Sequence, residues 1–385
     1  MNKIPLIENA CKELLEYGVR GWQEKGKDLA KRLLLRRKTP EEDPIFWTTG
    51  ILAAGLWACR AKSAMAGGHV ETAGASDGAV PVERIDRALA AYYERWLKKG
   101  MPLRYVDDLL AGETLLNMYR SVREKGTDFG VNLSEDRLKG AADRLASYAA
   151  DHAVDGAGSF LYRPAGGEKT VFVDGIGLAC PYLYQYGEAF DRQEYRELAV
   201  LQIVNFLSYG MDGKTGLPYH GYDMTDGCKY GIIGWGRAAG WLIRGMTGCM
   251  TSAYGRERIA VPCTALADAV IACQRQDGYF SWQLEAMEGP ADTSATGMIC
   301  AGLKRGMSLG VLAGETYEKA LTAGRRALER SVRDGQVYQC SGECEGFSQY
   351  PQRYGAYPWS LGPALEVLQG MRGCIKGNLA AAFEE

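Results

Sequence analysis

The 385 residues carry 45 Lys and Arg against 47 Asp and Glu, so the net charge of −2 is nearly balanced. No basic tract of the kind that binds nucleic acid is present, and we expect no nucleic-acid partner. Hydrophobic residues make up 46% of the chain, enough for a sizeable core, while 49 glycines, nearly twice the roughly 7% of average chains, favour many tight connections.

Apolar residues recur every three or four positions in twelve segments, which is the spacing of amphipathic helices. In chain order the predicted helices are 4–18, 46–61, 85–98, 108–123, 135–153, 173–188, 192–209, 236–251, 259–275, 293–309, 315–331 and 359–372. Alternating strand patterns are rare, and short hairpins are predicted near 159–162, 278–282 and 336–339.

Twelve helices in succession can bury their apolar faces as an open solenoid or as a closed toroid of six hairpins. No motif recurs at a fixed period, which favours the toroid. Short polar turns alternate with longer loops rich in Gly, Trp and Tyr, so we expect one plain end and one functional end. We predict a single all-α domain over residues 1–385, with a flexible surface insertion at about 67–80.

Cysteine usage and the N-terminus predict a cytoplasmic protein. The first residues lack the apolar region of a secretory signal, and the longest apolar run, 45–59, is too short and too interrupted to cross a membrane. Most of the 11 cysteines lie at helix-like apolar positions, as buried free thiols do. With three His and no CxxC pair, we expect no zinc site.

Asp174 is the first candidate for catalysis. It stands between Phe172-Val173 and an apolar run, where a loop turns into a predicted helix. An aspartate there can be a simple helix cap. Its apolar flanks favour the protonated form, whereas a helix N-terminus favours the ionised form, so desolvation and a second carboxylate would have to prevail for Asp174 to act as an acid.

Further candidates lie in loops or at helix starts. Asp107 could be the second carboxylate, although the pair with Asp108 also suits a cap beside a solvated neighbour. His220, among glycine and tyrosines, could hydrogen-bond sugar hydroxyls. Arg237 and Trp241 would share one helix face and could bind a carboxylate and stack on a sugar, or could pack together in a core groove. Trp359, Tyr357 and Trp282 follow the same logic, and Trp235 belongs to the same segment as Arg237 and Trp241.

These residues resemble the motifs of the unsaturated rhamnogalacturonyl hydrolases, glycoside hydrolase family 105, and of the related unsaturated glucuronyl hydrolases, family 88. The resemblance runs from about Phe46 to Leu368. The matching segments are Phe172-Val173-Asp174-Gly175, His220-Gly221-Tyr222-Asp223, Trp235 to Trp241, Asp292 to Gly297, and Tyr357 to Pro363, with Asp107 in an earlier Asp-Asp context. Phe172 and Ala239 stand where the family has Trp and Asn.

The resemblance implies an (α/α)6 barrel that acts on oligosaccharides ending in a 4,5-unsaturated uronic acid. Asp174 would protonate C4, water would add at C5, and the hemiketal would open and release the next sugar. Asp107 would position the substrate and favour the protonated form of Asp174. It further implies that His220 would hold ring hydroxyls and Arg237 the uronate. The tryptophans would stack on the substrate, and no cofactor would take part.

Two other interpretations remain open. A sugar epimerase would use the same barrel but would want several histidines at the mouth, where this chain offers one good candidate. A non-catalytic helical scaffold would predict that Asp174→Asn affects stability alone. The sequence is compatible with a monomer or a homodimer.

Overall fold

The structure is a computed structural model that describes residues 3–17, 45–65, 82–164, 169–347 and 349–369. The predicted insertion at 67–80 lies outside the described residues. Within them the helices are α1 (Ile4–Glu16), α3 (Trp47–Met65), α4 (Val82–Lys98), α5 (Ala111–Lys125), α6 (Glu135–Ala150), α7 (Asp174–Ala189), α8 (Gln193–Tyr209), α9 (Gly236–Gly248), α10 (Ala253–Ile271), α11 (Thr293–Ser308), α12 (Glu315–Arg330) and α13 (Pro358–Leu368).

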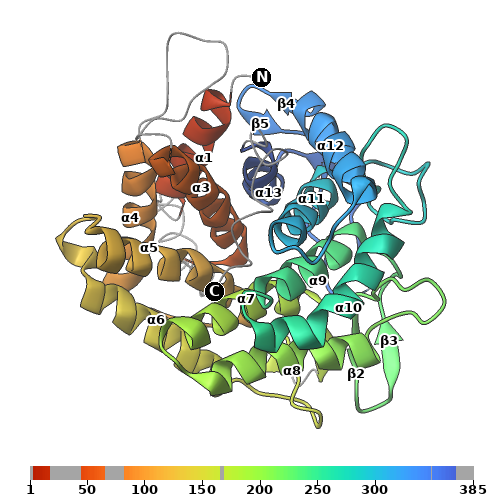
Figure 1. Ribbon diagram of the computed structural model, residues 1–385, viewed down its shortest axis with the longest axis horizontal. Coiled ribbons are helices and arrows are strands. Elements are labelled where there is room, and N and C mark those ends of the chain that lie inside the picture. Colours follow the sequence, from red (N-terminus) through yellow and green to blue (C-terminus); the bar gives the residue numbers. More distant parts are fainter. Residues whose placement is uncertain (1–2, 18–44, 66–81, 165–168, 348, 370–385) are drawn as a thin grey trace, which may run out of the picture.

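An inner ring of helices surrounds the centre of the molecule, as Figure 1 shows. Helices α3, α5, α7, α9, α11 and α13 pack each against the next, and α13 packs against α3 and closes the ring. The other six cover it, so the chain alternates between an outer and an inner helix. This arrangement is the predicted (α/α)6 barrel.

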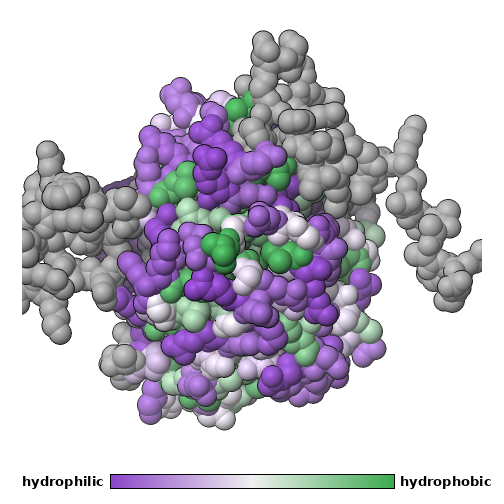
Figure 2. All heavy atoms as spheres, turned by 90° about the vertical axis from the view of Figure 1, so that its left-hand side faces the viewer, coloured by the Kyte–Doolittle hydropathy of each residue, from purple (hydrophilic) through white to green (hydrophobic). Residues whose placement is uncertain are grey.

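The two rings differ in how their helices are buried. In the outer helix α4 the buried residues, among them Ile85, Leu89 and Trp96, recur every three or four positions, because one face meets water. In the inner helix α7 the residues from Asp174 to Gly187 are all buried. Figure 2 shows the outer surface on the α4 and α6 side, where hydrophobic atoms are scattered among hydrophilic ones.

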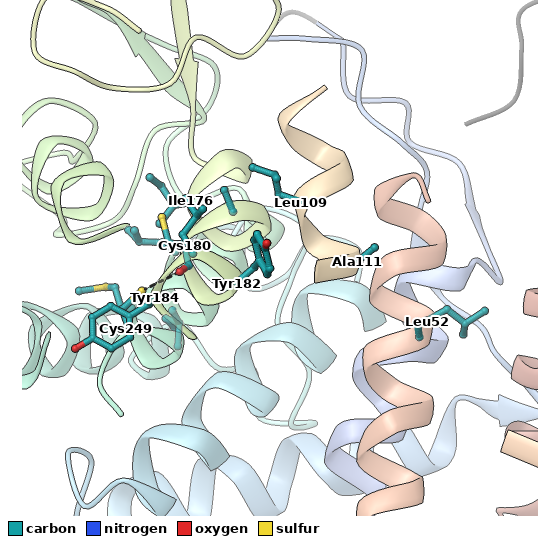
Figure 3. Close-up of a cluster of buried hydrophobic side chains, with 14 of the residues drawn as sticks. Leu52, Leu109, Ala111, Ile176, Cys180, Tyr182, Tyr184 and Cys249 are labelled. Atoms are coloured by element: carbon teal, nitrogen blue, oxygen red, sulfur yellow. Dashed lines mark hydrogen bonds between the residues drawn. The ribbon is translucent and has the colours of Figure 1, made fainter. Parts of the chain in front are cut away.

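The inner helices approach one another closely at glycines. A Cβ on Gly55 of α3 would lie 2.3 Å from the carbonyl oxygen of Gly362 in α13, so a larger residue would force the two helices apart. Figure 3 shows the core between α7 and its neighbours, where Ile176, Cys180 and Tyr182 of α7 lie near Leu109, which precedes α5, and Ala111, its first residue.

The connections differ in length at the two ends of the barrel, as predicted. Connections from an inner to an outer helix are short at 190–192, 249–252 and 309–314, whereas those that lead into α7, α9, α11 and α13 span 151–173, 210–235, 272–292 and 331–357. The long connections meet at the N-terminal ends of the inner helices, and this end carries the candidate site.

The long connections also contain short strands. Strands β1 (Thr170–Phe172), β2 (Gly221–Asp223) and β3 (Cys228–Tyr230) form an antiparallel sheet in the order β1-β2-β3 that the sequence did not predict. The hairpin predicted near 336–339 is present in part, since β4 (Val332–Arg333) pairs with β5 (Gln336–Val337). Near 159–162 and 278–282 single bridges replace the predicted hairpins. A further pair joins β6 (Cys340–Ser341) to β7 (Tyr354–Gly355).

Two predicted helices begin elsewhere. The helix predicted at 259–275 begins six residues earlier, at Ala253. The residue before it, Ser252, has extended backbone and is the N-cap. The segment predicted as 108–123 begins as a 3-10 helix, η1 (Val106–Leu110), and becomes α-helical at Ala111. This tighter turn carries Asp107.

None of the described helices is long and apolar enough to cross a membrane. The described cysteines are all free thiols and most of them are buried.

Candidate active site

A pocket opens where the inner helices begin. Its volume is about 500 Å³ including the open mouth. It is lined by Trp47, Asp107, Tyr162, Arg163, Phe172, Asp174, Leu178, His220, Trp235, Arg237, Trp241, Glu343, Cys344 and Gly346. The pocket therefore brings together carboxylates, two arginines and a wall of aromatic rings from segments that lie far apart in the sequence.

Asp174 is the first residue of α7 and does not cap it. The residue before the helix is Val173, and no side chain makes a capping hydrogen bond there. Strand pairing sets its position, because Phe172 of β1 lies opposite Gly221 of β2 and the Val173 N–H donates to the His220 carbonyl. Asp174 is 9% exposed, and its Oδ2 lies 3.0 Å from Nε2 of His220.

Asp107 faces the same pocket, whereas Asp108 is the cap. Asp108 Oδ2 accepts the backbone N–H groups of Arg104 and Tyr105, which fixes the turn of η1. Asp107 is 3% exposed, and its Oδ1 has no hydrogen-bond partner among the described residues. Burial, helped by the nearby Asp174 carboxyl, raises the pKa of Asp107 to about 7 although Tyr162 hydrogen-bonds it.

His220 is fully buried and is engaged at both ring nitrogens. Besides the contact with Asp174, its Nδ1 lies 2.8 Å from the hydroxyl of Tyr350. The rings of Phe172 and Trp235 lie 4.8 and 4.4 Å from the imidazole. The expected contacts with sugar hydroxyls would thus compete with protein partners, and the geometry gives His220 the role of holding Asp174.

Arg237 lines the pocket, but most of its hydrogen-bonding groups already bind other groups of the protein. Its guanidinium donates to the Ser341 carbonyl at 3.1 Å and to the Gly342 carbonyl at 2.8 Å, and it lies 3.8 Å from Asp292. It also lies over the Trp235 ring, 4.7 Å from the centroid. These contacts attach the long connection before α13 to the start of α9, a structural task that the sequence did not reveal.

The predicted aromatic residues divide into two groups. Phe172, Trp235 and Trp241 line the pocket. Trp359 and Tyr357 do not; their rings stack with centroids 4.5 Å apart, and Trp359 packs behind the pocket against Trp47. These two residues support the pocket wall.

Sequence reasoning missed several residues of the pocket, notably Trp47, Tyr162, Arg163 and Glu343. Trp47 is the second residue of a predicted helix, as Asp174 is of another, and that parallel was the available signal. Tyr162 stacks on Phe172 with a centroid distance of 4.3 Å. The guanidinium of the exposed Arg163 contacts the Tyr162 ring at 5.8 Å and has no hydrogen-bond or ion-pair partner among the described residues.

Metal binding has no evident place in the described part of the chain, which contains no group of three His, Cys, Asp or Glu side chains suited to hold an ion. His220 is the single histidine among the pocket residues given above, which does not fit the several histidines expected of an epimerase.

A ring of six helical hairpins with carboxylates in an aromatic pocket defines a class, the carbohydrate-processing (α/α)6-barrel enzymes. The comparison with known families is more specific, because the family model of Glycosyl Hydrolase Family 88 matches residues 79–368. The chain belongs to this family and is a glycoside hydrolase, which confirms the resemblance found in the sequence.

Individual proteins are similar to this chain in sequence or in fold. A 24.9 kDa protein in the picA locus of Rhizobium radiobacter is 32% identical over 168 residues, which are 39% of this chain and 70% of the relative. A possible member of the GH105 family from Klebsiella pneumoniae has a TM-score of 0.74 at 16% identity, covering 94% of this chain and 91% of that one. The unsaturated glucuronyl hydrolase of Bacillus sp. GL1 has a TM-score of 0.62 at 18% identity, with 94% and 96% covered.

Proposed function

We propose that this protein removes a terminal 4,5-unsaturated uronic acid from oligosaccharides left by polysaccharide lyases. The observation that carries this proposal is the joint placement of Asp174 and Asp107, 67 positions apart in the sequence, in one narrow aromatic pocket. Rhamnose from pectic rhamnogalacturonan is our first candidate for the neighbouring sugar, as in family 105, and glycosaminoglycan fragments are the second. The buried free thiols suit a reducing compartment such as the cytoplasm.

Asp174 is the proposed acid. Its proton passes to C4 of the double bond, the π electrons form the new C–H bond, and the positive charge at C5 is shared with the ring oxygen. Water then adds at C5 and returns a proton to the Asp174 carboxylate. The resulting hemiketal opens and releases the next sugar, so the enzyme ends in its starting state.

Asp107 assists this step through its burial. With its pKa raised to about 7, its carboxyl carries a proton over much of the neutral range and can donate to a substrate oxygen. Its Oδ1, without a partner in the described part of the protein, is the atom available for that contact.

The uronate carboxylate needs a cation, and Arg163 is the better placed of the two pocket arginines. The Arg237 guanidinium already donates to Ser341 and Gly342, whereas that of Arg163 has no such partner among the described residues. The inner helices α3 and α7 begin at pocket residues and α9 begins between two of them, and the dipoles of these helices favour an anionic ligand. We therefore assign the uronate to Arg163 and a supporting role to Arg237.

The test is a screen of unsaturated disaccharides made by lyases from pectin, glycosaminoglycans and algal polysaccharides. Hydration destroys the conjugated enol ether, so turnover appears as a loss of ultraviolet absorbance with release of the neighbouring sugar. We expect turnover of at least one substrate class, with the saturated counterparts inert. Hydrolysis of saturated uronides at equal rates, or turnover of neither kind, would overturn the proposal.

A further inference from the structure

The imidazole of His220 bridges Asp174 and Tyr350, a residue to which no role has yet been assigned. The separations are 3.0 Å from Nε2 to Asp174 Oδ2 and 2.8 Å from Nδ1 to the Tyr350 hydroxyl. A neutral imidazole has one N–H and one bare nitrogen. The tautomer therefore decides whether His220 donates to Asp174 or accepts from it.

The surroundings of Tyr350 favour one tautomer. Burial raises the pKa of Tyr350, although the backbone at Ile232 lowers it, so the hydroxyl keeps its proton. Among the described residues, Nδ1 of His220 is the acceptor within hydrogen-bond distance of that proton. If Nδ1 carried a hydrogen instead, the hydroxyl proton of the half-buried Tyr350 would lose its acceptor among the described residues.

Packing keeps this arrangement in place. The Tyr350 ring contacts the rings of Trp235 and Trp282, both with centroids 5.7 Å away. Gly231 lies directly beside the contact, with φ of +81°, and a Cβ there would lie 2.5 Å from His220 Cβ and 2.6 Å from the Tyr350 hydroxyl oxygen. The imidazole thus has little room to turn.

We infer that Tyr350 is a positioning residue whose hydroxyl fixes the Nε2–H tautomer of His220, so that His220 donates to Asp174 Oδ2 and the transferable proton sits on Asp174 Oδ1. When Oδ1 gives its proton to the substrate, the negative charge that develops on the carboxylate is held by the Nε2–H. The catalytic part of this inference rests on the proposed function, whereas the tautomer does not.

The tautomer is measured directly by nitrogen-15 NMR of the imidazole rings. The chain has three histidines, so the His220 signals can be assigned by substituting His69 and His152 in turn. We expect a bare Nδ1 and a protonated Nε2 in the unaltered protein, and a mixture of tautomers in the Tyr350→Phe variant. A protonated Nδ1 in the unaltered protein would overturn the inference, and this measurement does not depend on how any variant folds.

Kinetics test the catalytic part. Tyr350→Phe should lower kcat about 10-fold, the effect of one neutral hydrogen bond, with little change in KM. Tyr354→Phe is the matched control, because it removes a nearby tyrosine hydroxyl that bonds Gln352 instead, and it should leave kcat unchanged. An unchanged kcat in Tyr350→Phe, or an equal loss in both variants, would refute the catalytic role. Failure of the proposed function would appear separately, as an unaltered protein that turns over no unsaturated substrate.

Discussion

Replacing Asp174 with Asn should abolish catalysis while leaving the fold intact. The side chain keeps its shape, and the amide oxygen can still accept from Nε2 of His220 at the 3.0 Å separation seen for Oδ2. The variant loses the acid itself, and general acid catalysis is worth about 10²–10⁴-fold in rate. The hydrogen bond from His220 is kept, so we expect the free energy of unfolding to fall by no more than about 1 kcal/mol.

The assay is the loss of enol-ether absorbance under substrate saturation, combined with equilibrium urea unfolding of the same samples. Asp223→Asn is a suitable control, because Asp223 lies in β2 close to His220 in sequence but its carboxylate accepts from the Thr225 N–H, and it is not among the pocket residues. A kcat in Asp174→Asn close to that of the control would show that Asp174 is not the acid. A large loss of stability together with activity would show that Asp174 is needed for the fold and would contradict the expectation that it acts only as the acid.

Three further predictions concern Asp107, Arg163 and Glu113. Because burial raises the pKa of Asp107 from 3.8 to about 7, the folded state keeps a proton that the unfolded state loses, so the free energy of unfolding should fall as pH rises between these values. In urea unfolding, Asp107→Asn should flatten the slope of this free energy against pH. Equal slopes in the two proteins would contradict the prediction. Arg163→Gln should raise KM several-fold with kcat nearly unchanged. This rise in KM should disappear when the substrate is the methyl ester of the uronate. A rise that persists with the ester would rule out the carboxylate contact. Glu113→Gln should cost about 3–5 kcal/mol in unfolding free energy, because Arg244, bonded to Glu113 at 2.6 Å, keeps a buried charge. Burial opposes ionisation of Glu113, but Arg244 and Arg305 outweigh the burial and lower the pKa of Glu113 to about 2. The stabilisation from Glu113 is therefore present above pH 4.5 and should be lost as pH falls toward 2. A thermal unfolding temperature that does not change over this range would refute this expectation.

The helices and their closure into a ring were accessible from sequence. Helix α4 illustrates why, since the spacing of Ile85, Leu89, Tyr92 and Trp96 is a local property of the chain and all four are buried as predicted. The three-stranded sheet was not predicted, because strands of three residues are too short to show an alternating pattern. Their pairing depends on contact between β1 and β2, which lie about fifty positions apart.

The candidate acid was also visible in the sequence, through its apolar flanks and its resemblance to a family motif. The sequence did not show what the side chains around Asp174 do. Arg237 is bound by the Ser341 and Gly342 carbonyls, and His220 is held between Asp174 and Tyr350. The contacts of Arg237 and of His220 both depend on how the long connection before α13 folds back over the start of α9.

The sequence by itself determined which segments are helical and which residue types could perform the chemistry, because helix formation and residue chemistry are local. Only the tertiary structure decided which cation remains available to a substrate and which residue holds the acid. Ring closure joins α3 to α13, nearly 300 positions later, and brings together loops whose composition says nothing about their neighbours. In a pocket this small, such contacts decide whether a polar side chain meets the substrate or is already used by the protein.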